Sequence, residues 1–236
     1  MKPENEIEKA KENAAKEAVK QVKNGYVIGL GSGSTAAYAI KEIGNRIRNE
    51  NLHVLAVPTS YQALLLAVDE GIPLTTLNEH SILDLTIDGA DQIDEKLNLI
   101  KGMGGALTRE KIVASASKKL VIVATENKKV KFLGENNHPV PVEVSSFALK
   151  TVIRKIEEIG GKPKIRNAKM KVGPLITDNG NLIIDANFGL IKNPEELEQK
   201  LKMIPGIIET GLFTGIADIV YIGKANLVEK IERNKI

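Results

Sequence analysis

The chain of 236 residues contains no cysteine and no tryptophan, and few other aromatic residues. The absence of cysteine excludes disulfide bonds, thiolate catalysis and cysteine-based zinc sites. The three histidines, His53, His80 and His138, share no ligand spacing, so we do not expect a structural zinc or iron site. A metal-free mechanism without a cofactor is the default expectation. Aromatic residues make up 3% of the chain, while hydrophobic residues make up 42%. The core must therefore consist mainly of Val, Ile, Leu and Ala, which are typical of buried parallel sheets and their covering helices.

Long hydrophobic runs are also missing. The longest uninterrupted apolar stretch, residues 63–68, is far too short to cross a bilayer, and the charged N-terminal residues do not form a signal peptide. The formal net charge of +3 is small, and lysine and glutamate are interspersed, unlike the basic surface of a nucleic-acid-binding protein. We therefore expect a cytoplasmic protein that binds neither nucleic acid nor a membrane.

Strands and helices alternate through the first half of the chain. Apolar residues at spacings of three and four predict a helix over 5–23. A glycine-rich turn at 31–35 leads into a helix that ends at 47, and further helices are predicted at 61–70 and 109–118. Between them lie predicted strands at 25–30, 54–57, 83–88 and 120–124. This alternation predicts βαβ units and a doubly wound, mostly parallel Rossmann-like sheet.

The pattern changes near residue 133, and the sequence NNHP at 136–139 indicates a boundary loop. The following elements are typical of a smaller α+β module with a ferredoxin-like order: a strand from 140, a helix at 147–159, a strand at 163–166, a hairpin of 175–177 and 181–186, a helix at 195–203 and a strand at 207–212. An apolar strand at 216–222 is expected to return to the first sheet. We predict an α/β protein in which residues 1–132 and 213–236 form a Rossmann-like catalytic domain, and residues 133–212 form an inserted α+β domain.

The first candidate binding segment is the glycine-rich loop GLGSGST at 29–35, between a strand and a helix. Its glycines let the backbone approach a ligand, and hydroxyl groups lie beside the N–H groups of a helix N-terminus, which suits a phosphate. One alternative is a strand-to-helix turn that is merely capped by a serine. Another is a dinucleotide-binding turn, because GSGSTA fits the form G-x-G-x-x-A. The second strand ends in PTS at 58–60, without the acid that would hold a ribose, which favours a single phosphate.

Two acids follow the strand predicted at 83–88. Asp88 and Asp91 enclose Gly89 and Ala90, whose small size leaves room for a substrate against the backbone. In a parallel sheet this strand ends at the same edge as the glycine loop. The carboxylates are suited to accept sugar hydroxyls or to exchange a proton with a hydroxyl or ring oxygen. The alternative is an Asx-type turn in which both acids bind their own backbone.

A second glycine-rich turn, KGMGGALTREK at 101–111, enters a helix. If Thr108 is the N-cap, Glu110 falls in the first helical turn, where a glutamate is commonly only a favourable partner for the helix dipole. With Lys101 and the two aspartates nearby, the same carboxylate could move a proton between carbons next to a carbonyl, while Lys101 stabilises the oxyanion. Position alone leaves both interpretations open.

Four motifs in series resemble those of the type A ribose-5-phosphate isomerase family: GLGSGSTA at 29–36, IDGADQID at 87–94, LIKGMGGALTREK at 99–111 and HPVPVEV at 138–144. The resemblance implies the reversible isomerisation of D-ribose 5-phosphate to D-ribulose 5-phosphate through a cis-enediolate, without metal, in the non-oxidative pentose phosphate pathway. It also implies a small-molecule phosphosugar as substrate and assembly as a homodimer or homotetramer.

The resemblance further implies roles for individual residues. Glu110 matches the base that moves a proton between C2 and C1, Lys101 matches the lysine that stabilises the enediolate oxygen, and Asp88 and Asp91 match acids that bind hydroxyls and assist ring opening. The implied substrate-binding residues are Ser32, Gly33, Ser34, Thr35, Asp88, Gly89, Ala90, Asp91, Lys101, Gly102, Met103, Gly104 and Lys128, with Lys11 as a weaker candidate for a phosphate contact. Met103 departs from the family's pattern, which has glycine at this position.

Relatives of this fold leave other functions open. A sugar-phosphate sensor would bind a phosphosugar without chemistry, a glucosamine-6-phosphate deaminase-like enzyme would release ammonia from an amino sugar phosphate, and coenzyme A transferases share the same beginning. Against the sensor, the set of Asp88, Asp91, Lys101 and Glu110 is more than simple binding requires.

Overall fold

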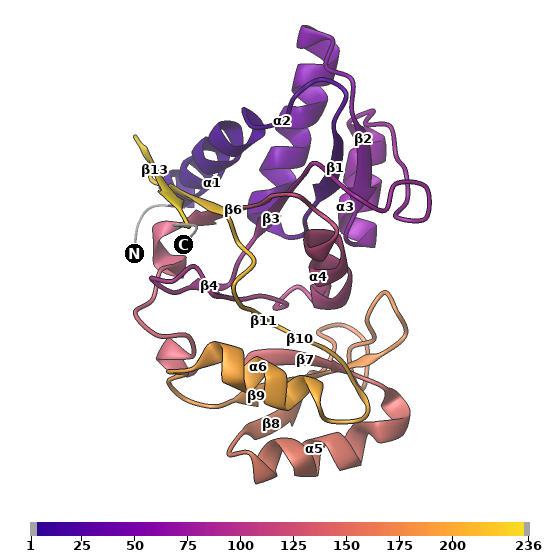
Figure 1. Ribbon diagram of the computed structural model, residues 1–236, viewed down its shortest axis with the longest axis vertical. Coiled ribbons are helices and arrows are strands. Elements are labelled where there is room, and N and C mark those ends of the chain that lie inside the picture. The colour runs from indigo at the N-terminus through magenta and orange to yellow at the C-terminus, as the bar shows by residue number, and fades with distance from the viewer. Residues whose placement is uncertain (1–3, 234–236) are drawn as a thin grey trace. The chain divides into compact units, whose positions relative to one another are not determined.

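The computed structural model describes residues 4–233 (Figure 1). The chain forms two compact units. Unit 1 comprises the residues up to Ala90, Arg109–Lys128 and the residues from Ile216 on, and unit 2 comprises Asp91–Thr108 and Lys129–Gly215. Residues 91–108 were predicted to belong to the Rossmann-like domain, whereas here they belong to unit 2. The predicted domain boundaries stay a prediction.

Unit 1 is built, within the described residues, on a six-stranded sheet of order β13-β12-β6-β3-β1-β2. All neighbouring pairs are parallel except that of β13, and the strands are β1 (Val27–Leu30), β2 (Leu55–Pro58), β3 (Leu85–Gly89), β6 (Leu120–Thr125), β12 (Ile219–Gly223) and β13 (Val228–Glu232). The predicted mostly parallel, doubly wound sheet is confirmed, including the return of β12 to pair with β6. Because β2 and β3 flank β1 on opposite sides, the strand order reverses at β1, which is where open α/β sheets bind ligands.

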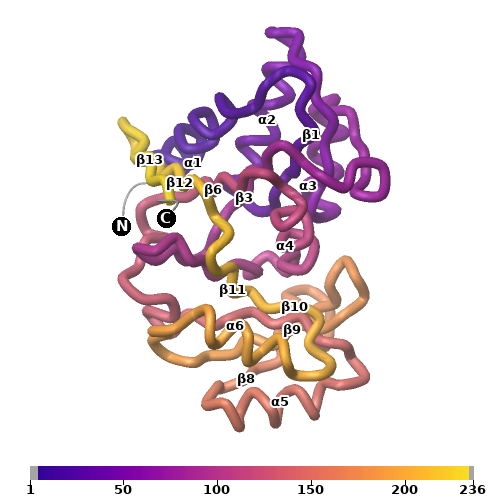
Figure 2. The backbone as a smooth tube through the Cα atoms, viewed as in Figure 1, coloured from indigo at the N-terminus to yellow at the C-terminus, as the bar shows by residue number. Residues whose placement is uncertain are grey.

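Four helices accompany this sheet in the described part of the chain: α1 (Glu4–Val19), α2 (Ser34–Glu50), α3 (Tyr61–Asp69) and α4 (Leu107–Ser115). Buried alanines, including Ala14, Ala15 and Ala18, let α1 approach its neighbours closely. Near the two ends of the chain, α1 and β13 lie side by side (Figure 2). Helix α4 begins in unit 2 and continues into unit 1 from Arg109 on.

Unit 2 contains a four-stranded antiparallel sheet of order β10-β7-β9-β8. Its chain order is β7 (Val140–Val144), α5 (Leu149–Glu158), β8 (Lys162–Ile165), β9 (Leu182–Asn187), α6 (Pro194–Lys202) and β10 (Ile207–Thr210). This β-α-β-β-α-β order confirms the predicted α+β module. The predicted hairpin around the turn at 178–180 is present as an isolated antiparallel bridge between Ile176 and Leu182, but residues 175–177 do not form a strand.

A second, three-stranded sheet in unit 2 was not predicted. It has the order β11-β5-β4 and consists of β4 (Gln92–Ile93), β5 (Leu99–Ile100) and β11 (Leu212–Phe213). Short 3-10 turns complete the described elements of the molecule, namely η1 (Glu126–Lys128), η2 (Glu135–Asn137) and η3 (Ser146–Ala148). Strand β5 ends directly before Lys101, so this small sheet holds the start of the second glycine-rich turn.

The four-stranded sheet has two different faces. One face packs into the core of unit 2 with residues of α5 and α6, and its members include Val140, Val142, Val144 and Ile184. The other face lies against the turn at 101–108: a Cβ added at Gly102 would lie 3.2 Å from Cβ of Pro141, and one added at Gly105 would lie 3.5 Å from Cδ1 of Ile183. The sheet therefore supports the second candidate loop.

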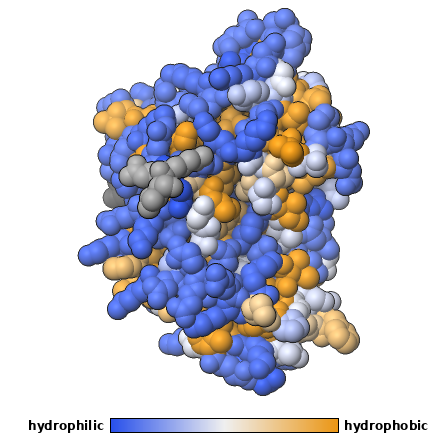
Figure 3. Space-filling view, in the orientation of Figure 1, coloured by the Kyte–Doolittle hydropathy of each residue, from blue (hydrophilic) through white to orange (hydrophobic). Residues whose placement is uncertain are grey.

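Hydrophilic side chains cover much of the face shown in Figure 3, and apolar side chains form separate patches on it. In the described range 4–233, none of the helices has the length and apolar character that a membrane span requires.

Candidate active site

The first glycine-rich loop and Asp88 lie together at the carboxyl ends of β1 and β3. The N–H of Gly31 donates to the Ile87 carbonyl (2.9 Å), and the N–H of Ser32 donates to Oδ1 of Asp88 (3.1 Å). A Cβ added at Gly31 would lie 2.4 Å from Cα of Asp88, a distance that no side chain tolerates. Asp88 is fully buried, and its Oδ1 also accepts from the N–H of Gly89 (2.7 Å). Glycine at position 31 thus brings the loop against the acid.

Helix α2 starts without a capping side chain among the described residues. Its N-cap is Gly33, with φ of 98°, which is a backbone conformation that glycine adopts without strain. The predicted loop residues Ser34 and Thr35 are the first residues of the helix. The alternative of a serine-capped turn is therefore wrong. The N–H of Gly33 donates to Oε1 of Gln62 (2.9 Å).

Two hydroxyl residues that the sequence analysis missed lie beside this loop. Oγ of Ser32 lies 2.8 Å from Oγ1 of Thr59 and donates to Oγ of Ser60 (2.5 Å). Thr59 in turn donates to the Leu30 carbonyl (2.9 Å), and Ser60 caps α3 by accepting from the N–H of Ala63 (3.1 Å). The signal that points to these hydroxyls is the position of residues 58–60 at the end of β2, because parallel strands end at a shared edge of the sheet.

Glu110 lies in the first turn of α4 and is 4% exposed. One turn later, Val113 fills the space above Gly29, where a Cβ would lie 2.5 Å from Cγ1 of Val113. Further along, Ser117 lies 2.6 Å from Thr86 through their hydroxyl oxygens. The helix therefore runs from the carboxyl ends of β1 and β3 back along the sheet, and Glu110 is at its leading end.

The two candidate lysines of unit 1 have different surroundings. Lys128 ends η1, directly after β6, and is partly buried near the same edge of the sheet. Lys11 in α1 forms an ion pair with Glu8 (2.7 Å), which also accepts from the hydroxyl of Tyr38 (2.8 Å). These hydrogen bonds, from Lys11 first and then Tyr38, lower the pKa of the Glu8 carboxyl below its ordinary value of 4.5. Lys11 is thus already engaged by an ionised carboxylate.

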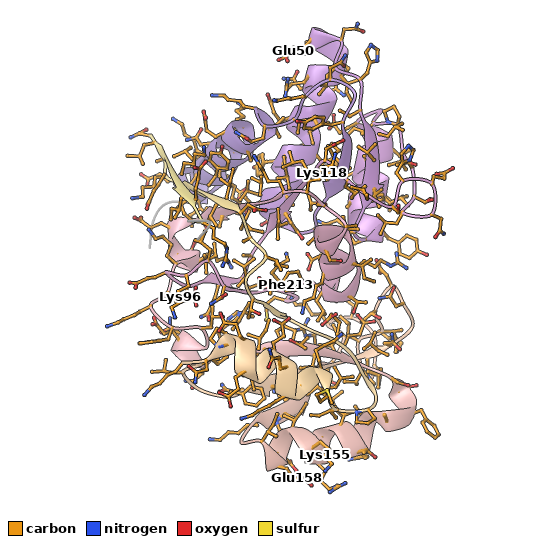
Figure 4. All side chains as sticks on the ribbon, in the orientation of Figure 1. Glu50, Lys96, Lys118, Lys155, Glu158 and Phe213 are labelled. Carbon is orange, nitrogen blue, oxygen red and sulfur yellow. The ribbon has the colours of Figure 1, made fainter. Side chains whose placement is uncertain are left out.

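The remaining predicted site residues belong to unit 2. The N–H of Asp91 donates to the Ile100 carbonyl (2.8 Å), and Oδ2 of Asp91 accepts from the N–H of Met103 (3.0 Å). Lys101 is 2% exposed, and its Nζ lies 5.4 Å from the centre of the Phe213 ring (Figure 4 labels Phe213). Gly102 has φ of 100°, and Gly104 is exposed in the turn.

Arg166, which the sequence analysis missed, holds the second glycine-rich turn. Its Nη1 donates to the carbonyls of Gly102 (2.8 Å) and Met103 (3.1 Å), and its Nη2 lies 3.8 Å from Sδ of Met103. The carboxylate of Asp185 accepts hydrogen bonds from both Nε (2.9 Å) and Nη2 of the same guanidinium. No sequence signal marks this pair, because Arg166 follows β8 and Asp185 lies in β9, both far from the turn in the chain.

The structure therefore divides the predicted site residues into two groups. Unit 1 contains the first group: Ser32, Gly33, Ser34, Thr35, Asp88, Gly89, Ala90, Glu110 and Lys128. Unit 2 contains Asp91, Lys101, Gly102, Met103 and Gly104. Between residues 4 and 233, no group of three or more His, Asp or Glu side chains is arranged to hold a metal ion.

Comparison with known proteins gives the relationship directly. The family model of ribose 5-phosphate isomerase A (phosphoriboisomerase A) matches residues 55–227. The chain is 50% identical over 214 residues to ribose-5-phosphate isomerase A of Methanosarcina acetivorans, which covers 91% of this chain and 90% of that protein. The fold is similar to that of ribose 5-phosphate isomerase A from Methanocaldococcus jannaschii, with a TM-score of 0.91 and 49% identity over 95% of this chain and 99% of the other. It is also similar to a D-ribose-5-phosphate isomerase in complex with phospho-erythronic acid, with a TM-score of 0.93 and 45% identity over 96% and 99% of the two chains. The chain therefore belongs to the ribose 5-phosphate isomerase A family.

Proposed function

We propose that this protein interconverts D-ribose 5-phosphate and D-ribulose 5-phosphate, a reaction of the pentose phosphate pathway. The observation that carries the proposal is the similarity to ribose-5-phosphate isomerase A proteins over more than nine-tenths of the chain. The predicted family and the predicted class of enzyme, an aldose-ketose isomerase, are confirmed by the same comparisons. The roles of individual residues are proposals, which the following observations support.

The loop at 32–35 and Lys128 are proposed to bind the phosphosugar in unit 1. The loop leads into the N-terminus of α2, which has no capping side chain in the described part of the chain, and the positive end of the helix dipole there favours an anion. Gly89 supports the proposal that a substrate lies against this backbone. A Cβ added at Gly89 would meet no atom closer than 3.6 Å, so protein packing does not require glycine there.

The proposed chemistry is a proton transfer between neighbouring carbons. In the open-chain aldose, the C1 carbonyl acidifies the hydrogen on C2, and the Glu110 carboxylate takes this proton and returns it to C1. The hydroxyl proton moves from the oxygen of C2 to that of C1. Lys101 stabilises the negative charge on the enediolate, while Asp88 and Asp91 bind hydroxyls and assist ring opening.

Burial supports the roles of the base and the lysine. Glu110 lies in the first turn of α4, where the positive end of the helix dipole favours a carboxylate. Lys101 is nearly inaccessible to solvent, and a charge in such surroundings interacts more strongly with a developing oxyanion than it would in water.

The test is to follow ketose formation from D-ribose 5-phosphate with a chelator present, and to compare the wild type with Glu110→Gln. We expect turnover in the wild type and a loss of at least about a hundredfold in kcat for Glu110→Gln, because the amide cannot accept the proton. The matched control is Glu157→Gln, which changes an exposed glutamate of α5 and should keep full activity.

Two outcomes would favour the other candidate functions. Saturable binding of the phosphosugar without turnover in the wild type would identify a sensor. Release of ammonia from an amino sugar phosphate would identify a deaminase. The predicted cytoplasmic location and the predicted homodimer or homotetramer stay predictions.

A further inference from the structure

Two acids of unit 2 point from the four-stranded sheet toward the turn at 101–108. In the pairing of β7 with β9, Glu143 is opposite Ile183, and Pro141 is opposite Asp185. Because side chains alternate between the two faces of a strand, Glu143 and Asp185 share one face. Asp185 acts on the turn through Arg166, as described above, whereas Glu143 contacts it directly.

Glu143 is fully buried and accepts four hydrogen bonds from described residues, all from uncharged groups. Its Oε1 accepts from Oγ1 of Thr177 (2.9 Å), Nδ2 of Asn179 (3.1 Å) and Nδ2 of Asn181 (2.9 Å). Its Oε2 accepts from Oγ1 of Thr108 (2.6 Å). Oε1 thus binds side chains of the turn at 177–181, and Oε2 binds a side chain in the first turn of α4.

Because Glu143 is fully buried, its side chain depends on these hydrogen bonds. A carboxylate removed from water is tolerated only when hydrogen bonds satisfy it, and bonds to an ionised acceptor are short and strong. The bond of 2.6 Å to Thr108 therefore fixes the side chain that lies two residues before Glu110, in the same first turn of α4. Successive residues of a helix are related by a fixed rotation, so the orientation of Thr108 sets the direction in which Glu110 leaves the helix.

We propose that Glu143 is a positioning residue for Glu110 and acts through the hydroxyl of Thr108. The inference rests on the proposed function, in which Glu110 is the base. A base that is misplaced by about 1 Å loses about a hundredfold in rate, so even partial loss of this link is measurable. Glu143 itself does not touch the substrate in this proposal.

The experiment compares two variants that each remove one hydroxyl donating to the carboxylate of Glu143. Thr108→Val removes the bond to Oε2, and Thr177→Val removes a bond to Oε1. Both keep the shape of the side chain. The hydroxyl of Thr177 also accepts from the N–H groups of Asn179 (3.3 Å) and Asn181 (3.1 Å), so Thr177→Val should lower the midpoint of urea denaturation at least as much as Thr108→Val. We expect Thr108→Val to reduce kcat at least about tenfold with KM within about twofold of the wild type, whereas Thr177→Val keeps kcat. Thr108→Ser, which retains the hydroxyl, should restore kcat.

A variant that combines two substitutions tests whether Glu143 and Thr108 act together. Glu143→Gln should reduce kcat as Thr108→Val does, and the variant with both changes should be no slower than Glu143→Gln alone. If Thr108→Val does not fold, Thr108→Ala with Glu143→Gln provides the same comparison.

The proposal is overturned if Thr108→Val keeps the wild-type kcat, or if Thr177→Val loses as much kcat as Thr108→Val. Either result would make Glu143 a residue of stability alone, and the isomerase would remain established by the activity of the wild type. An inactive wild type, or a fully active Glu110→Gln, would instead refute the proposed function and its base.

Discussion

Met103 stands where the resemblance to the family implied glycine, and the turn around it is held by hydrogen bonds. Unlike Gly102 and Gly105, Met103 does not have a positive φ, so a side chain causes no backbone strain there. Its N–H binds Asp91, its carbonyl binds Arg166, and its sulfur lies against the same guanidinium. The side chain therefore adds a contact on the side of Arg166 and leaves the backbone hydrogen bonds of the turn in place.

Arg166 is the residue whose loss should loosen this turn most. Replacing it with Met removes two donors to the carbonyls of Gly102 and Met103 and leaves Asp185 without its guanidinium. We expect Arg166→Met to lower the free energy of unfolding by about 2 kcal/mol and to lower kcat about tenfold, because Lys101 begins this turn.

Urea denaturation and steady-state kinetics measure both effects of Arg166→Met. The control is Arg154→Met, which removes a guanidinium whose ion pair with Glu158 lies on the surface of α5. Surface ion pairs contribute little to stability, so Arg154→Met should change neither the free energy of unfolding nor kcat appreciably. Full activity of Arg166→Met would show that the turn keeps its conformation without the arginine.

At the scale of the element, Asp84 fastens the start of β3 to its neighbours. Its carboxylate accepts from Nζ of Lys118 (2.7 Å; Figure 4 labels Lys118) and from the N–H of Val27 (3.0 Å). These bonds, that of Lys118 first, lower the pKa of the Asp84 carboxyl below its ordinary value of 3.8. A carboxyl whose pKa is lower in the folded state stabilises the fold at pH values above its pKa in the unfolded chain. This stabilisation is lost as the pH falls through its pKa in the folded state.

We therefore expect Asp84→Asn to lower the free energy of unfolding by about 1 kcal/mol at neutral pH. The difference from the wild type should shrink as the pH falls below 3.8, where the wild-type carboxyl also becomes protonated. Urea denaturation at a series of pH values measures this. The control is Asp69→Asn at the exposed end of α3, and a difference for Asp84→Asn that does not depend on pH would contradict the assignment.

The elements that the sequence predicted well are those with enough residues to show a period. Strand β6 is buried along its whole length and helix α2 has one buried face, so both leave a clear apolar pattern. Strands β4, β5 and β11 contain two residues each and have no period to detect. In β7, the alternation of Val140, Val142 and Val144 indicates one buried face and suggests solvent at Glu143, but the turn at 101–108 covers that second face.

At the scale of the whole molecule, neither unit is a continuous stretch of sequence. The chain passes from one unit to the other after Ala90, Thr108, Lys128 and Gly215. Each predicted motif at 87–94 and 99–111 therefore contributes residues to both units, a division that linear patterns cannot reveal. The motifs did predict the family, which the comparisons confirm, because residue type and order are read directly from the sequence.

Ligand binding gives a prediction for the molecule as a whole. A compound that binds only the folded state stabilises it by mass action, by about 2.7 kcal/mol at a hundred times its Kd. For a chain of this length we expect the Tm to rise by about 5 to 10 °C with phospho-erythronic acid, the compound found in a structurally similar isomerase. Glu110→Gln should keep this rise although it lacks turnover, because the amide preserves the shape of the site, and inorganic phosphate should give a smaller rise. Differential scanning calorimetry measures all three. Because binding and turnover are read separately, an unchanged Tm would refute phosphosugar binding itself and not merely the assignment of the base.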